Sequence, residues 1–197
     1  DQCNHTFYSQ VAAISRGQWC SYCANKKLCS DINCQLCFEK SFASHSTASL
    51  WSSQNEKTPR DYFRSSREKV WMDCPDCLHS NEVAITNITT KGQGCPYCSN
   101  KKLCSNQECQ LCFEKSFASV LEKDPQKTFS WSPRNKLLPR DVFRSSTYRG
   151  LFDCHQCSHT FEAALHNATV SIAGAKNAKD SAAGHGCSSV SYTHLRA

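Results

Sequence analysis

The sequence predicts small α+β modules, each built from a β-hairpin and a short helix and held together by cysteines, with little conventional core. Cysteine supplies 16 of the 197 residues. Hydrophobic residues, cysteines included, make up only 39% of the chain, against roughly 45–50% in an ordinary soluble domain. Modules with so little apolar surface need additional cross-links, and the cysteines can supply them.

An internal repeat supports the modular organisation. Residues 25–29 recur at 100–104, and residues 34–44 recur at 109–119 with the same offset. The motif that runs from Trp51-Ser52 through Pro59-Arg60-Asp61 recurs at 131–141, with a slightly larger offset. Self-similarity at a nearly fixed period indicates that each repeat is one supersecondary unit.

The first kind of cysteine site pairs two Cys-x2-Cys turns at a nearly constant separation along the chain. Zinc prefers four tetrahedral ligands, and thiolates suit it, so this spacing predicts a zinc site. The complete example consists of Cys74, Cys77, Cys95 and Cys98. Two incomplete examples are Cys3, Cys20 and Cys23, whose first cysteine would precede residue 1, and Cys154, Cys157 and Cys187, which has Val190 in place of the fourth cysteine.

The second kind of site is Cys-x4-Cys-x2-Cys followed by residues that favour a helix. It occurs at Cys29, Cys34 and Cys37 and again at Cys104, Cys109 and Cys112. Three thiolates leave one tetrahedral position for another ligand. We predict that His45, which follows Cys37 in the same run, completes the first site, the alternative being a capping or surface histidine.

The second copy of this site lacks that histidine, because Val120 stands in its place. Glu122, Asp124 or water are the alternatives for its fourth ligand. A further histidine recurs two residues after a cysteine in each copy, as His5, His79 and His159. We expect these side chains to hydrogen-bond the backbone beside the metal, with a ligand role where a cysteine is missing.

Disulfides are the alternative explanation for all the cysteines. Asn4, Asn87 and Asn167 begin glycosylation sequons, which is compatible with secretion. Repeated pairs at fixed separation fit metal binding better than a disulfide framework. We therefore predict up to five structural Zn²⁺ sites, several of them incomplete, in a protein of an intracellular, reducing compartment.

The repeat also predicts the domain organisation. Residues 1–37 are expected to form a partial zinc repeat with a truncated first turn, and residues 38–112 a complete one. Residues 113–187 are expected to form a third repeat with a flexible Ala- and Lys-rich insertion at about 173–183. Residues 188–197 match nothing upstream and resemble a non-native tail.

Several secondary-structure elements follow from local patterns. Residues 69–73 predict a strand that leads into the Cys74 turn. Pairs spaced i, i+4, such as Phe38 with Phe42 and Phe113 with Phe117, predict a helix after the second kind of site. Apolar spacing predicts a helical face at Phe7, Val11 and Ile14 and at Phe161, Leu165 and Ala168. The middle copy has the same spacing at Asn81, Ile85 and Ile88, with a weaker first position, but residues 82–85 fit a strand equally well. Trp51, Trp71 and Trp131 are expected to cover the zinc sites and to form the small core of each module, the alternative being base stacking.

The ordered motifs resemble a known family. The elements are Trp51-Ser52-x2-Asn55-x3-Pro59-Arg60-Asp61, then Trp71-x2-Cys74-x2-Cys77-x-His79, and finally Gly94-Cys95-Pro96-Tyr97-Cys98. In this order they resemble the tandem treble-clef or zinc-ribbon repeats found in bacteria, large DNA viruses and environmental sequences. The resemblance covers about residues 1–187 and implies zinc and a treble-clef-like hairpin with a helix. The family's molecular function is largely unassigned, and nucleic-acid binding is the usual suggestion.

The net charge does not by itself identify a partner. The formal charge is +6, but a Zn²⁺ ion held by four thiolates carries about −2 and one held by three about −1, because the ion's own charge must be counted. Five filled sites would therefore offset the surplus. Local basic patches remain, and we expect nucleic-acid contacts at Lys26, Lys27, Arg60, Arg64, Lys101, Lys102, Arg140 and Arg144. The alternative is that some of these side chains only offset nearby thiolates or pair with Asp61 and Asp141.

We therefore predict a non-catalytic, zinc-binding module that binds DNA or RNA. A zinc-stabilised scaffold for another protein is the alternative, as is the recognition part of a longer nuclease. No phosphate-cradling glycine loop and no His-Glu-x2-His motif occurs in the sequence, which argues against an enzyme. No stretch approaches the roughly 20 apolar residues that span a bilayer, so no membrane partner is expected.

Overall fold

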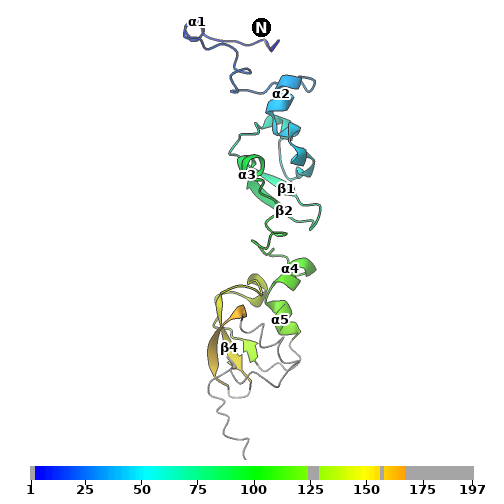
Figure 1. Ribbon diagram of the computed structural model, residues 1–197, viewed down its shortest axis with the longest axis vertical. Helices are drawn as coiled ribbons and strands as arrows, with labels where there is room; N and C mark the ends of the chain where they lie inside the picture. Colours follow the sequence, from blue (N-terminus) through cyan, green and yellow to red (C-terminus); the bar gives the residue numbers. More distant parts are fainter. Residues whose placement is uncertain (1–2, 124–128, 156–157, 167–197) are drawn as a thin grey trace, which may run out of the picture. The chain divides into compact units, whose positions relative to one another are not determined.

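The computed structural model describes residues 3–123, 129–155 and 158–166, which belong to two units, Asp1–Cys98 and Ser99–Ala197. The predicted insertion at 173–183 and the tail at 188–197 lie outside the described residues. Both units are small and α+β, with short helices and antiparallel strands (Figure 1). The predicted fold class is confirmed.

Unit 1 is organised around one β-hairpin. Its elements are α1 (Val11–Ile14), α2 (Gln35–Lys40), the 3-10 turns η1 (Phe42–Ser44), η2 (Ser46–Leu50) and η3 (Pro59–Asp61), the strands β1 (Lys69–Asp73) and β2 (Ser80–Ala84), and α3 (Ile85–Lys91). β1 occupies the predicted range, and it pairs antiparallel with β2. Alternation along β1 buries Val70 and Met72 on one face, as the period of two in a strand requires.

The strand and the helix predicted within residues 81–88 are both present, one after the other, because the strand β2 passes directly into the helix α3. Val83 on β2 and Ile85 and Ile88 on α3 are buried against Val70 and Phe42. Trp51 packs at the edge of this cluster, as predicted. Trp71 does not, because it lies on the outer face of β1 with 37% of its surface exposed.

The predicted helix after Cys37 begins earlier and ends sooner. α2 starts at Gln35 and stops at Lys40, and Ser41 is extended with φ −83° and ψ 162°. Its backbone bridges Phe63, which turns Phe42 into the core, fully buried, while Phe38 stays 37% exposed. The predicted i, i+4 contact is therefore wrong.

The predicted N-terminal helical face is also incomplete. Only Val11–Ile14 is helical, Phe7 precedes the helix, and Val11 is 83% exposed. These residues do not form a buried face in unit 1.

Unit 2 repeats the plan with a three-stranded sheet. Its described elements are α4 (Gln110–Lys115), α5 (Ala118–Glu122), β3 (Phe129–Trp131), the 3-10 turn η4 (Pro139–Asp141), β4 (Arg149–Cys154) and β5 (Thr160–Ala164). The strand order is β3-β4-β5, all antiparallel. Phe161 lies on the strand β5, so the helical face predicted there is wrong; Ala168 lies outside the described residues. Phe117, Val120, Phe152 and Leu165 form the core, and Trp131 packs against it.

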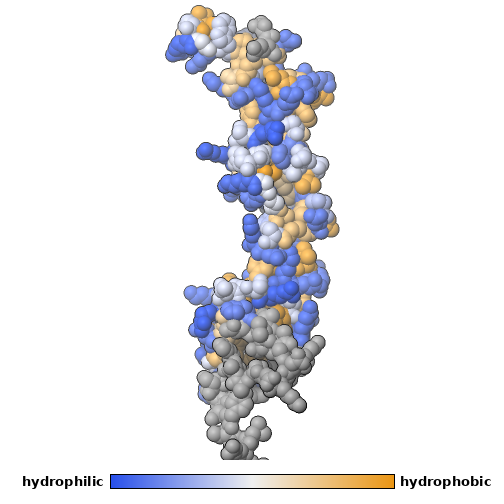
Figure 2. All heavy atoms as spheres, in the orientation of Figure 1, coloured by the Kyte–Doolittle hydropathy of each residue, from blue (hydrophilic) through white to orange (hydrophobic). Residues whose placement is uncertain are grey.

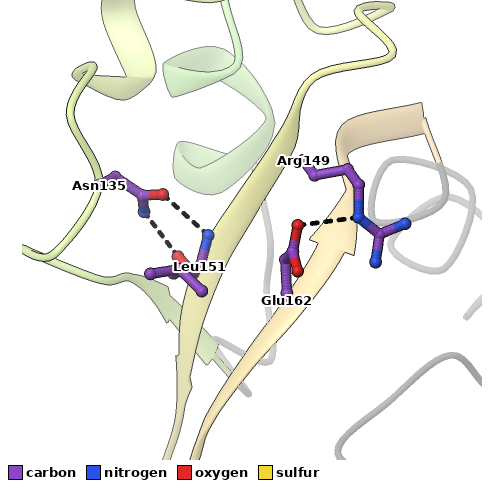
Figure 3. Close-up of polar contacts among 4 residues, drawn as sticks. All are labelled: Asn135, Arg149, Leu151 and Glu162. Carbon is purple, nitrogen blue, oxygen red and sulfur yellow. Dashed lines mark hydrogen bonds and ion pairs between the residues drawn. The ribbon is translucent and has the colours of Figure 1, made fainter.

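One motif residue explains how the chain before each hairpin is fixed. Asn135 donates its side-chain amide to the Leu151 carbonyl at 2.7 Å and accepts the Leu151 N–H at 2.8 Å (Figure 3). Asn55 makes the same pair of bonds to Trp71, at 2.7 and 2.8 Å. The side chain thus takes the place of one residue of a paired strand. In unit 2 an ion pair of 2.8 Å between Arg149 and Glu162 also joins β4 to β5 (Figure 3).

No helix among the described residues is long and apolar enough to cross a membrane. On the face drawn in Figure 2, hydrophobic residues lie interspersed among hydrophilic ones. The apolar residues that do cluster are the two small cores, one in each unit.

Candidate metal centres

The tetrathiolate site (Cys74, Cys77, Cys95 and Cys98) is assembled by the hairpin and α3 of unit 1. Its first two cysteines occupy the turn between β1 and β2, and the other two follow α3, which Gly92 ends in the left-handed conformation with φ 59°. All four sulfur atoms lie within 4.8 Å of one another. The Sγ–Sγ distance is 3.6 Å between Cys74 and Cys98 and 3.5 Å between Cys77 and Cys95.

These separations fit a shared metal rather than a disulfide. A bonded S–S pair is about 2.05 Å apart, whereas two sulfurs at tetrahedral angles and about 2.3 Å from zinc are about 3.8 Å apart. None of the described cysteines is disulfide-bonded. The donor set and its spacing therefore fit structural zinc, as predicted.

Cys74 and Cys77 lie in one turn, but their pKa values are shifted in opposite directions. Burial works to raise the pKa of Cys74, but backbone N–H groups of Cys77 and Asp76 hydrogen-bond its sulfur and bring the pKa below the usual value. Burial raises the pKa of Cys77 instead. The metal-free site therefore holds protons that zinc must displace. The turn also has a recurring backbone conformation: Leu78, the residue after Cys77, is left-handed with φ 58°, as are Asn4 and Ser158 at the matching positions.

His5, not His45, joins the three cysteines of the Cys29 site (Cys29, Cys34 and Cys37). Its Nε2 atom lies 3.3 Å from Cys34 Sγ and 3.5 Å from Cys37 Sγ. Ligands about 2.0 Å (nitrogen) and 2.3 Å (sulfur) from one zinc ion at the tetrahedral angle would be about 3.5 Å apart. All four ligand atoms lie within 4.8 Å of one another, which makes this a Cys3His centre.

The prediction of His45 as the fourth ligand is therefore corrected. Its Nδ1 atom lies 2.9 Å from Thr47 Oγ1 and accepts the Thr47 N–H at 3.3 Å, and its ring stacks on Phe42. His45 is the cap of the turn η2, which was the alternative considered for it. Val120 at the matching position is 9% exposed and belongs to the core of unit 2.

The sequence carries a signal for His5, namely its recurrence two residues after a turn cysteine. We expected that position to make a backbone hydrogen bond, with a ligand role only where a cysteine is missing. In the structure the His5 ring stacks on Tyr22, with centroids 4.3 Å apart, which orients Nε2 toward the cysteines. His79 stacks on Tyr97 in the same way, at 4.2 Å.

Arg60 and Arg140 lie against the cysteines of the second kind of site. Arg60 Nη2 donates to Cys29 Sγ at 3.8 Å and to the carbonyls of Asp31 and Cys34 at 3.1 and 3.3 Å. Arg140, which is only 5% exposed, makes the matching contacts to Cys104 Sγ at 3.8 Å and to the carbonyls of Asn106 and Cys109 at 2.9 and 3.3 Å. The structure thus places these two predicted phosphate contacts at the metal centres instead.

In unit 2 the Cys104 site (Cys104, Cys109 and Cys112) gathers at the start of α4. Their sulfur atoms lie within 4.8 Å of one another, and burial raises the pKa of Cys112 to about 11. Glu122, considered as a ligand, is not part of the group. Asp124 lies outside the described residues.

The two incomplete sites of the first kind differ in what can be described. Cys3, Cys20 and Cys23 lie together, with 3.3 Å between the Cys3 and Cys20 sulfurs. A hydrogen bond that the Cys23 thiol donates to Cys3, together with desolvation, raises the pKa of Cys23 to about 11. Cys154 is the last residue of β4 and is buried, whereas Cys157 and Cys187 lie outside the described residues.

The remaining predicted nucleic-acid contacts are exposed in the structure. They are Lys26, Lys27, Arg64, Lys101, Lys102 and Arg144. Lys101 and Lys102 also line a hollow in unit 2 with Cys104, Asp141 and Phe143.

Comparison with known proteins agrees with the geometry. Residues 47–101 match the family described as a probable treble clef zinc finger domain. The chain is also 38% identical over 144 residues to an uncharacterised protein of Acanthamoeba polyphaga mimivirus. The alignment covers 73% of this chain and 34% of that protein, so the chain spans about a third of the relative's length.

Proposed function

Because residues 47–101 form a probable treble clef zinc finger domain, we propose that this chain is a zinc-stabilised, non-catalytic module that binds nucleic acid through its phosphates. The observation that carries the proposal is a pair of exposed lysines at the same place before two metal centres. Lys26 and Lys27 precede Cys29, and Lys101 and Lys102 precede Cys104.

The local backbone explains how these lysines are presented. Asn25 and Asn100 both have φ 55°, a left-handed conformation that asparagine tolerates better than most residues. The chain reverses there, and in unit 1 the N–H of Lys26 bonds the Ser21 carbonyl at 2.9 Å. Each turn is followed at once by a cysteine of a metal centre, so zinc binding would fix the position of both charges.

Arg64 and Arg144 extend the basic surface of each copy. Both follow the Pro-Arg-Asp turn closely in the sequence, and their backbone N–H groups bond the carbonyls of Lys40 and Lys115. Cations held by such a scaffold can bind phosphates, and phosphate contacts position a protein on nucleic acid without reading the base sequence. The proposed contacts are therefore Lys26, Lys27, Arg64, Lys101, Lys102 and Arg144.

The metal sites support a structural rather than a catalytic role for zinc. The tetrathiolate site has four protein ligands and the Cys29 site has three cysteines and His5. A catalytic zinc keeps one position open for water or substrate, and neither donor set leaves one.

The test is a titration of the zinc-loaded chain with duplex DNA, single-stranded DNA and RNA at several salt concentrations. We expect saturable binding whose affinity falls with salt, with a log–log slope of about −0.9 per phosphate contact on duplex DNA. The double variant Lys26→Ala, Lys27→Ala should weaken binding to all sequences and flatten the slope by about one to two units.

A matched control removes the same charge elsewhere. Lys91 and Lys136 are exposed and outside the proposed contacts, so the variant Lys91→Ala, Lys136→Ala should keep the wild-type slope. Equal losses in both variants would show only an effect of net charge. Absence of saturable binding to all three nucleic acids at low salt would overturn the proposal.

One observation favours a protein partner as the second candidate. A hollow of about 260 Å³ adjoins the tetrathiolate site, and its lining includes Leu50, Met72, Val83 and Ile88 together with Asp73, Asp76, Asn81 and three of the site's cysteines. A hollow that combines apolar side chains with acidic ones suits a partner's side chain better than a phosphate. If the titration shows no nucleic-acid binding, this scaffold function takes precedence.

A further inference from the structure

We propose that Arg60 and Arg140 are the outer-shell partners and counter-ions of the Cys29 and Cys104 metal centres, each one donating a hydrogen bond to the sulfur of the first cysteine of its centre. This role is independent of any nucleic-acid binding. It assigns these two residues to the metal chemistry of the chain rather than to its surface.

The same geometry occurs in both copies. In each, one terminal nitrogen of the guanidinium reaches a cysteine sulfur at 3.8 Å and two backbone carbonyls of the same cysteine loop at 2.9 to 3.3 Å. Both arginines come from the Pro-Arg-Asp turns, η3 and η4, 31 and 36 residues after the cysteine that they contact. The longer connection in the second copy thus leaves the contact unchanged.

The charge balance requires an anion at this place. Arg140 is 5% exposed, and the Nε and Nη1 atoms of both arginines are buried without a hydrogen-bond partner. Within the part of the chain that the structure describes, neither forms an ion pair with a carboxylate. A buried cation without a partner is strongly unfavourable.

The adjacent aspartates do not supply that anion. Asp61 accepts hydrogen bonds from Thr58 N and Oγ1 at 2.9 and 2.7 Å, and Asp141 is exposed. At the Cys29 centre, a zinc ion with three thiolates and one neutral histidine would carry about −1, which one arginine offsets.

Two chemical consequences follow from a guanidinium N–H at the sulfur. As an outer-shell contact it orients the sulfur and stabilises the metal-bound thiolate, so it favours metal binding. It also engages a lone pair of the sulfur, so the zinc-bound thiolate becomes a weaker nucleophile. Cys29 and Cys104 should therefore be the cysteines whose reactivity depends on these arginines.

The experiment compares Arg60→Gln with Arg140→Gln in the full zinc-loaded chain, so that each copy is the other's reference. The readouts are limited alkylation with iodoacetamide, mapped by peptide mass spectrometry, and zinc affinity by chelator competition. Arg60→Gln should speed alkylation of Cys29 and lower the affinity of its centre about 10- to 100-fold, as for other outer-shell partners, with Cys104 unchanged. Arg140→Gln should have the same effects on Cys104 and its centre, with Cys29 unchanged.

Two controls separate this role from general stability. Arg67→Gln removes an exposed charge and should alter neither readout, whereas Arg60→Lys should restore part of the affinity by keeping the charge. The sulfur-to-metal absorption band of the Co²⁺-substituted chain should shift in Arg60→Gln. Alkylation of Cys29 and Cys104 at wild-type rates, or equal opening of the tetrathiolate site in the same variant, would overturn the proposal.

Discussion

His5 completes the coordination of the Cys29 site, so its loss should lower the zinc affinity of that site. We expect His5→Ala to lower zinc affinity there by more than about tenfold, since even outer-shell partners have effects of that size. His45→Ala is the matched control, because His45 caps η2 and contacts no cysteine in the described structure. Native mass spectrometry during chelator competition would count the ions retained by each variant. Loss of an ion from His45→Ala, with His5→Ala unaffected, would contradict the assignment.

At the residue scale the sequence predicts cysteines better than their partners. Spacing within a turn is a local property, and Cys74, Cys77, Cys95 and Cys98 come together as their spacing requires. His5 reaches Cys34 from 29 positions away, and no local pattern encodes that approach. Charge alone suggested a surface role for Arg60, whereas its burial depends on how the Pro-Arg-Asp turn packs.

The turn η3 offers a test at the scale of one element. Thr58 and Asp61 form a capping box in unit 1, whereas Leu138 replaces the threonine in unit 2 and no such box forms. We expect Asp61→Ala to destabilise its turn by about 0.5–2 kcal/mol, the usual range for a lost cap, and Asp141→Ala to have little effect. Hydrogen exchange of the Thr58 amide in the zinc-loaded chain would measure the change.

The same element gives a pH dependence of known sign. Hydrogen bonds from the side chain and backbone of Thr58 lower the pKa of Asp61. Stabilisation by the carboxylate is therefore present above its usual pKa and is lost as the pH falls through the lowered one. Thr58 protection that stays constant through this acidic range, or falls equally in Asp61→Ala, would contradict the assignment.

Elements were predictable where the pattern was local and strong. β1 has the alternation of a half-buried strand and the predicted range. The prediction for the run after Cys37 failed because tertiary pairing overrode helix preference: Ser41 leaves the helix to bridge Phe63, and the N–H of Phe42 bonds the Tyr62 carbonyl at 2.7 Å. These partners lie beyond η2 and η3 in the sequence, outside any window of helical periodicity.

For the whole molecule, we expect folding to depend on zinc. The core of each unit is one small cluster around Phe42 or Phe117, whereas a structural zinc can contribute about 10–16 kcal/mol at neutral pH. A strong chelator under reducing conditions should abolish the circular dichroism of the folded chain, and added zinc should restore it. Full retention of secondary structure after verified metal removal would refute this dependence.

The raised pKa values of two cysteines determine how the zinc affinity changes with pH. Cys23 and Cys112, both with a pKa of about 11, are protonated at neutral pH without metal, and zinc must displace those protons. Affinity, measured by chelator competition at several pH values, should therefore rise with pH by about one log unit per pH unit for each proton displaced. The fold class was predictable at this scale, because cysteine spacing and strand alternation depend only on order along the chain.

Cys3 and His5 belong to different metal centres yet are separated only by Asn4. When either centre holds its ion, the ligand of the other is tethered beside it, at an effective concentration in the millimolar range typical of short linkers. Capture of the second ion then becomes an intramolecular step. The two centres should fill and empty as a cooperative pair, so the residence time of each ion depends on its neighbour.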